Sequence, residues 1–189
     1  MLGEARYLSY IYEVNMMIYL RSINNIKPNY MILENFKNGY EVANGSLLAK
    51  SEKNDCLVRA FANALNVTYD VAHKFTAEKF ERKFRKGAKM TIDKLSKLGK
   101  VSFELFKDTL FPVTKEYNLK FIHNPINPEY THKQVKYTVK TFSAMFNKGT
   151  YVVLVHKHAL TIKDGIVVDN PNNRFDGYRR VVMGYIKVS

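Results

Sequence analysis

The spacing of hydrophobic residues changes along the chain. Up to about residue 110 they recur every three or four positions, which predicts helices over residues 56–65, 68–87, 91–98 and 102–110. Further on, β-branched and aromatic residues predict strands over residues 119–122, 151–155, 158–162, 166–168 and 181–188, with one or two helical turns at 141–147. A mostly helical first part followed by an antiparallel sheet gives an α+β fold class.

The helix predicted at 56–65 begins with Cys56, the only cysteine of the chain. Asn54 or Asp55 can cap it, because such side chains accept hydrogen bonds from backbone N–H groups of the first turn. Cys56 would then lie where unpaired N–H groups and the helix dipole stabilise a thiolate, which can act as a nucleophile. Lone cysteines are also commonly inert core residues, so a partner histidine is needed to decide.

Asp164-Gly165 stands between two short apolar strands, and this dipeptide is a strong signal for a hairpin with a two-residue turn. The turn fixes the register and places His158 and Asp169 on one face of the hairpin, as diagonal neighbours. At that spacing the carboxylate can orient the imidazole through a hydrogen bond to one ring nitrogen. Cys56, His158 and Asp169 are therefore the candidate nucleophile, base and orienting carboxylate.

Two alternatives stay open in this segment. A different turn would exchange Asp169 for Asn170, and His156 competes with His158 as the base if the strand runs straight. An H-x-H pair can also hold a metal ion, but the chain has one cysteine and no third ligand at suitable spacing. We therefore expect no metal and no other cofactor.

The order of these residues resembles that of papain-like cysteine peptidases, especially the small bacterial and bacteriophage members related to the bacteriocin-processing peptidases. The resemblance spans about residues 50–170 and is carried by Asn54-Asp55-Cys56 with Arg59-Ala60, and by His158-Ala159 with Asp164-Gly165 and Asp169. It implies a papain-like fold in which the nucleophile helix packs on the C-terminal sheet. It also implies a Cys-His-Asp site and acyl-transfer chemistry.

One departure from that family concerns the oxyanion. Such peptidases place a glutamine several residues before the cysteine, whereas residues 49–53 of this chain contain none. Asn54 could donate an amide N–H instead, alongside the backbone N–H of Cys56. Losing one oxyanion donor typically costs about 10²–10³ in rate. The departure is compatible with a slow enzyme, an enzyme that uses Asn54, or a fold retained for binding.

The implied function is that of a cysteine-dependent hydrolase or acyl-transferase of thiol-protease type. His158 would take the thiol proton, and the thiolate would attack a peptide, isopeptide or other amide to give a thioester. We expect a phage or bacterial protein that acts on host proteins. The alternative is a catalytically weak or inactive papain-like fold that binds a host protein or nucleic acid.

The chain carries a formal net charge of +13, which attracts acidic partners. The segment from Lys79 to Lys100 holds nine Lys and Arg against two acidic residues. If Phe80 and Phe84 lie on the buried side of a helix, the basic side chains between them and just beyond turn outward: Arg82, Lys83, Arg85 and Lys86. We expect them to bind an acidic protein substrate or partner. Nucleic acid is the second choice, because no reader motif is recognisable.

Breaks at Asn24-Asn25 and Pro28 divide the chain into an extension over residues 1–30 and a domain over residues 31–189. The single cysteine suits a reducing compartment. The longest early apolar stretch is too short to span a bilayer, and no signal-peptide pattern is visible. We therefore expect a cytoplasmic protein, in the host cell if phage-encoded, that has no membrane partner.

Overall fold

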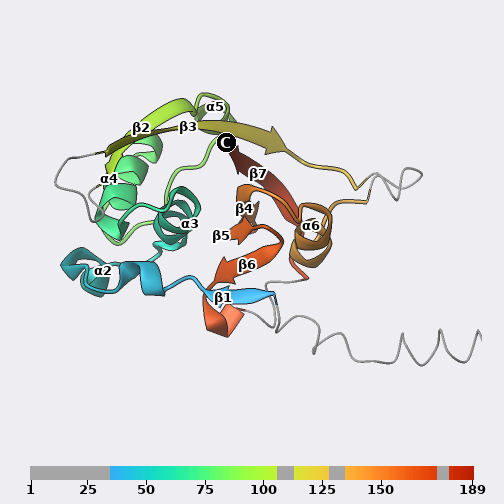
Figure 1. Cartoon of the computed structure of the whole chain (residues 1–189), viewed down its shortest axis with the longest axis horizontal. Coiled ribbons are helices and arrows are strands. Elements are labelled where there is room, and N and C mark those ends of the chain that lie inside the picture. Colours follow the sequence, from blue (N-terminus) through green and yellow to red (C-terminus); the bar gives the residue numbers. More distant parts are fainter. Residues whose placement is uncertain (1–34, 106–112, 128–134, 174–178) are drawn as a thin grey trace, which may run out of the picture. The chain divides into compact units, whose positions relative to one another are not determined.

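A computed structural model describes residues 35–105, 113–127, 135–173 and 179–189. Within them, seven strands form one mixed sheet in the order β1-β6-β5-β4-β7-β3-β2 (Figure 1). Neighbouring strands are antiparallel, except that β1 pairs with β6 in parallel. The strands are β1 (Phe36–Asn38), β2 (Gly99–Leu105), β3 (Val113–His123), β4 (Thr150–Val155), β5 (His158–Lys163), β6 (Ile166–Asp169) and β7 (Val182–Val188). The α+β class is therefore confirmed.

Helical segments fill the first part of the described chain and recur between strands. They are η1 (Glu41–Ala43), α2 (Leu47–Ser51), α3 (Cys56–Leu65), α4 (Tyr69–Phe80), α5 (Ile92–Ser96), α6 (Val139–Met145) and η3 (Pro171–Asn173). Thr68 and Thr91 cap α4 and α5, as their positions in the sequence predict, because each side-chain oxygen accepts from a backbone N–H two to three residues into the helix. None of the described helices is both long and apolar enough to cross a membrane.

Helices α3 and α6 cover opposite faces of the sheet (Figure 1). Successive side chains of a strand point to opposite faces. On β4, Val152 belongs to the core that α3 enters, whereas Tyr151 meets Phe142 of α6 edge to face, with ring centroids 5.6 Å apart. The buried hydroxyl of Thr161 on β5 donates to the Ala60 carbonyl at 2.7 Å. This bond fixes α3 on the strands formed by the C-terminal part of the chain.

The helix predicted over residues 102–110 is wrong for residues 102–105, and its remainder lies outside the described residues. Residues 99–105 form strand β2, which pairs with β3 in the register Ser102↔Glu116. The reason lies in a two-residue alternation, since Val101, Phe103 and Leu105 are more buried than the residues between them. Ser102 at a cap-like position hid this alternation. The strand predicted at 119–122 is the end of the longer β3.

The predicted boundary near residue 31 lies outside the described residues, as does the whole extension. The described elements begin with β1 at Phe36, so the sheet and its core are built from residues beyond that boundary. A chain that begins at Met31 should therefore unfold in one cooperative transition and stay monodisperse, as measured by thermal melting and size-exclusion chromatography. Aggregation or a non-cooperative melt would show that residues 1–30 complete the core.

Candidate active site

Cys56 is the first residue of α3 and is partly exposed. Asp55 occupies the N-cap position, yet its side chain makes no cap hydrogen bond. Its Oδ2 instead accepts from Arg59 Nε at 2.9 Å and from the Tyr69 hydroxyl at 2.8 Å. The N–H groups of the first turn are thus not capped by Asp55, which leaves the positive end of the helix beside the thiol.

The Arg59 side chain is also fixed by these contacts. Its guanidinium lies 4.0 Å from the centre of the Tyr40 ring, besides its bond to Asp55. Burial and the hydrogen bond to Asp55 hold the pKa of Tyr69 well above its ordinary value, so Tyr69 stays a donor. Arg59 therefore holds Asp55, the residue directly before α3, in place.

His158 and Asp169 form the pair that the hairpin turn predicts. Nε2 of His158 lies 2.9 Å from both carboxylate oxygens of Asp169, and each residue is 8% exposed. The strands pair with Lys163 opposite Ile166, as a two-residue turn requires. Asn170 is directed elsewhere, since its Nδ2 donates to the Tyr40 hydroxyl at 3.0 Å.

The backbone of Asp169 is fixed from the neighbouring strand. The N–H of Gly39, directly after β1, donates to the Asp169 carbonyl at 2.8 Å. A Cβ atom added to Gly39 would lie 3.0 Å from the Asp169 nitrogen. Residue 39 is therefore a glycine because the Asp169 backbone leaves no room for a side chain.

His156 is not on the face of His158. Val155 pairs with His158 across the β4–β5 hairpin, so His156 and Lys157 form its turn, and the His156 side chain is exposed. The strand does not run straight through this point, because Lys157 adopts a left-handed backbone with φ of 56°, so the condition under which His156 would compete is not met. Within the described residues, no group of three His, Cys, Asp or Glu side chains could hold a metal ion.

The Cys56 thiol is the second hydrogen-bond partner of His158, besides Asp169. Burial by itself lowers the pKa of His158, but hydrogen bonds with Asp169 and with Cys56, and the charges of both groups, raise it to about 9. Because Asp169 holds Nε2, Nδ1 is the nitrogen that remains for Cys56. At neutral pH the imidazole is thus protonated and faces the thiol, an arrangement that stabilises a thiolate.

Asn54 stands two residues before Cys56 in the sequence, in a left-handed backbone conformation with φ of 54°. Its Nδ2 donates one hydrogen bond to the Arg85 carbonyl, at 3.2 Å. The side chain is therefore held by a segment that follows α4. Its expected role as an oxyanion donor stays a prediction.

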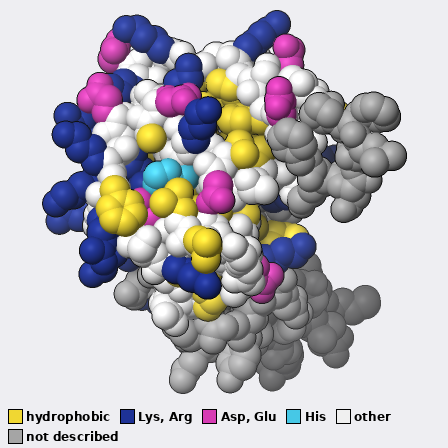
Figure 2. Space-filling view, turned by 90° about the vertical axis from the view of Figure 1, so that its left-hand side faces the viewer, with side chains coloured by type: hydrophobic (Ala, Val, Ile, Leu, Met, Phe, Trp, Pro, Cys, Tyr) yellow, Lys and Arg dark blue, Asp and Glu magenta, His cyan; other side chains and the backbone are white. Residues whose placement is uncertain are grey.

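Arg82 does not face solvent, contrary to the sequence-based expectation. The residue is 4% exposed, and its Nη2 donates to Glu52 Oε2 at 2.7 Å, with both side chains fully buried. The helix predicted to reach Gly87 ends at Phe80, because Glu81 adopts a left-handed conformation and redirects the chain. Lys83, Arg85 and Lys86 remain exposed. On the face that bears α2 and α4, Lys and Arg side chains gather along one border (Figure 2).

We call the contacts around Glu52 the Glu52 clamp, made by Glu52, Arg82, His73 and the backbone of Lys53 and Arg85. Arg82 Nη2 also donates to the Lys53 carbonyl at 3.2 Å, and the Arg85 N–H donates to Glu52 Oε2 at 3.0 Å. Burial raises the pKa of Glu52, but hydrogen bonds from Arg82, His73 and Arg85 lower it to about 2. The clamp joins the loop before Cys56 to the segment after α4. No sequence motif links these residues.

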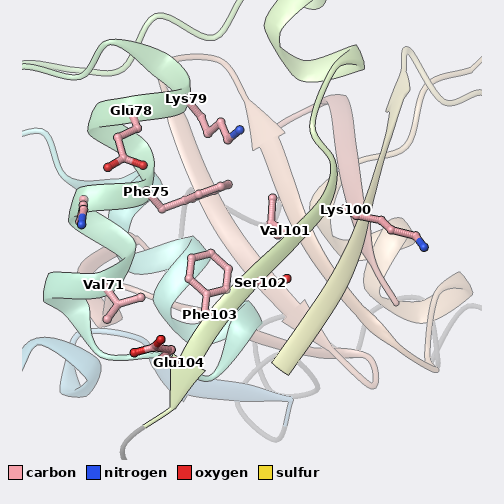
Figure 3. A pocket seen from close by; sticks show the side chains of 10 residues that line it. Val71, Phe75, Glu78, Lys79, Lys100, Val101, Ser102, Phe103 and Glu104 are labelled. Carbon is pink, nitrogen blue, oxygen red and sulfur yellow. The ribbon is translucent and has the colours of Figure 1, made fainter. Parts of the chain in front are cut away.

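A cavity of about 670 Å³ lies away from this site, between α4 and β2 (Figure 3). Phe75 and Phe103 meet edge to face in it, with ring centroids 5.4 Å apart, and Lys79 and Lys100 line it as well. The candidate catalytic residues do not line this cavity. Comparisons with protein-family models, with curated proteins and with solved structures find no match to the chain.

The Glu52 clamp should contribute strongly to stability. Replacing Arg82 by Ala leaves Glu52 buried without its cation, which typically costs about 3–5 kcal/mol. Lys83→Ala is the matched control, since an exposed substitution usually changes stability by no more than about 0.5 kcal/mol. Urea unfolding of both variants measures this difference. Equal free energies of unfolding would contradict the buried ion pair.

The raised pKa of His158 should make stability depend on pH. An unfolded histidine titrates near about 6.5, and the folded one near about 9. The extra stability is therefore fully present below the pKa of the unfolded histidine. It is lost as the pH rises through the pKa of the folded histidine, and the total loss is at most about 3 kcal/mol. Urea unfolding between these pH values should show this loss, and Asp169→Asn should reduce it. If the unaltered protein and the Asp169→Asn variant show the same pH dependence, Asp169 does not raise the pKa of His158.

Proposed function

We propose that this protein is a cysteine-dependent hydrolase or acyl-transferase of papain-like type. The substrate would be a peptide, an isopeptide or another amide. The proposal is carried by one observation: His158 is hydrogen bonded to Asp169 and to Cys56, which begins a buried helix on the sheet. Enzymes that use covalent catalysis of this type bring a nucleophile, a base and an orienting carboxylate together from distant parts of the sequence.

The chemistry follows from the charge on each group. The thiolate of Cys56 adds to the carbonyl carbon, and the carbonyl electron pair moves to the oxygen. The backbone N–H of Cys56 and an amide N–H of Asn54 would hold this oxyanion. As the C–N bond breaks, the His158 imidazolium gives its proton to the leaving nitrogen, which leaves a thioester on Cys56.

The second half of the reaction uses the same groups. His158, now neutral, removes a proton from water or from another acceptor as that molecule attacks the thioester. The C–S bond breaks, and the proton on His158 restores the thiolate–imidazolium pair. Water as acceptor makes the protein a hydrolase, and an amine as acceptor makes it an acyl-transferase.

A binding protein on the same fold is the second candidate. This candidate is favoured by the hydrogen bond from Asn54 Nδ2 to the Arg85 carbonyl, because Nδ2 is the donor that the oxyanion would need. In that case Cys56 would be reactive toward small electrophiles without turning over an amide. Its partner would be a host protein or nucleic acid.

Alkylation of Cys56 by iodoacetamide tests the proposed site, because the chain has a single cysteine and therefore a single thiol to label. Cys56 should react faster than a free thiol at neutral pH. Loss of the His158 imidazolium should slow the reaction by about tenfold or more, because the thiolate loses the positive charge beside it. Asp169→Ala should slow it as well, because the imidazole loses its hydrogen-bond partner.

Asn170→Ala is the matched control for that experiment, since Asn170 bonds to Tyr40 rather than to His158. Its labelling rate should equal that of the unaltered protein. Rates are followed by mass spectrometry of the intact chain. A Cys56 that labels no faster than a free thiol would refute the proposed function.

A further inference from the structure

Residues 83–86 form an exposed basic segment, which we call the 83–86 segment. Lys83, Arg85 and Lys86 are exposed, and none of them forms an ion pair with the residues that the structure describes. Phe84 is 52% exposed, and the Arg85 guanidinium lies 5.9 Å from its ring centre. The segment thus presents three positive charges around one aromatic side chain.

Nearby carboxylates do not neutralise these charges. Glu52 is buried against Arg82, with 2.7 Å between the two groups. Glu81 pairs with Lys94 at 2.7 Å and approaches Lys89 at 3.5 Å. The positive potential of the 83–86 segment is therefore available to a partner.

The segment is held beside the nucleophile. The Arg85 carbonyl accepts from Asn54 Nδ2 at 3.2 Å, and the Arg85 N–H donates to Glu52 Oε2 at 3.0 Å. Asn54 stands two residues before Cys56 in the sequence. The Glu52 clamp therefore fixes the backbone of this segment against the loop that leads into the thiol.

We propose that the 83–86 segment binds the substrate of the Cys56 site and selects an acidic stretch of polypeptide next to the reacting carbonyl. This inference rests on the proposed function and names its substrate class. Arg and Lys recognise carboxylates through charge-assisted hydrogen bonds, with Arg able to bind both oxygens at once. Long-range attraction by a chain of net charge +13 speeds the encounter with such a substrate.

The aromatic content of the segment favours polypeptide over nucleic acid. Binding of a single strand relies on successive aromatic side chains on which the bases stack. The 83–86 segment offers Phe84 alone, flanked by cations. One ring beside Arg and Lys suits an apolar side chain within an acidic sequence.

The first experiment measures binding without chemistry. Full-length Cys56→Ser protein is titrated with a fluorescein-labelled peptide rich in Glu and Asp, and with the same peptide carrying Gln and Asn instead. The acidic peptide should bind more tightly. The triple variant Lys83→Glu, Arg85→Glu, Lys86→Glu should weaken its binding by about tenfold or more, as expected for the loss of three exposed ion pairs.

A second triple variant, Lys120→Glu, Lys140→Glu, Lys187→Glu, serves as the control. These side chains are exposed on β3, α6 and β7, and the change in net charge is the same. The control should keep the preference for the acidic peptide. Melting temperatures of both triple variants show that the fold is retained.

The second experiment places the acidic peptide at the thiol. Both peptides are made as chloromethyl ketones, which alkylate Cys56: a C–S bond forms to the chloromethyl carbon as chloride leaves. Each rate is divided by the iodoacetamide rate of the same variant, so that changes in thiol reactivity cancel. The acidic probe should react faster than the neutral one, and the 83–86 variant should lose this advantage.

The outcomes separate this inference from the proposed function. A reactive Cys56 with equal rates and affinities for both peptides would overturn the inference alone, as would loss of the preference in the control variant. An unreactive Cys56 would refute the proposed function, while peptide binding still decides what the surface recognises. An oligonucleotide that binds more tightly than the acidic peptide, and only with the 83–86 segment intact, would overturn the inference in favour of nucleic acid.

Discussion

Two fully buried charges, those of Glu52 and Arg82, support the candidate site. An ion pair without solvent carries a large desolvation cost, and it persists where further hydrogen bonds satisfy both groups. Here the additional bonds come from the backbone on either side of the pair, at Lys53 and Arg85, although the buried Arg82 Nε has no hydrogen-bond partner among the described residues. The same contacts thus stabilise the charges and hold the loop in front of Cys56 in place.

The pairing of His158 with Asp169 could be predicted from a local signal. The turn at Asp164-Gly165 was sufficient to pair His158 with Asp169 rather than with Asn170, because a two-residue turn leaves one register. The start of α3 at Cys56 followed from its apolar spacing. Those features depend on residues near one another in the sequence, where backbone conformation and side-chain alternation are determined by few contacts.

Other features depend on contacts that the sequence pattern does not contain. Arg82 was expected at the surface, yet its partner Glu52 lies thirty residues away and no motif connects them. The end of α4 depends on a left-handed Glu81, whereas the glycine that signals a helix end in the sequence, Gly87, stands six residues later. Strand β2 carries its own alternation of Val101, Phe103 and Leu105, but Ser102 at a cap-like position favoured a helix, and only the pairing with β3 decides between the two.

The division of the site between distant segments has a consequence for biosynthesis. Cys56 leaves the ribosome long before His158 and Asp169 do, and β4 gains its neighbour β7 only after both of them. Helix α3 can form early, because helices need only local contacts. The nascent protein therefore carries an isolated cysteine, and its thiol meets the His158 imidazole only after residues 158–169 have been made.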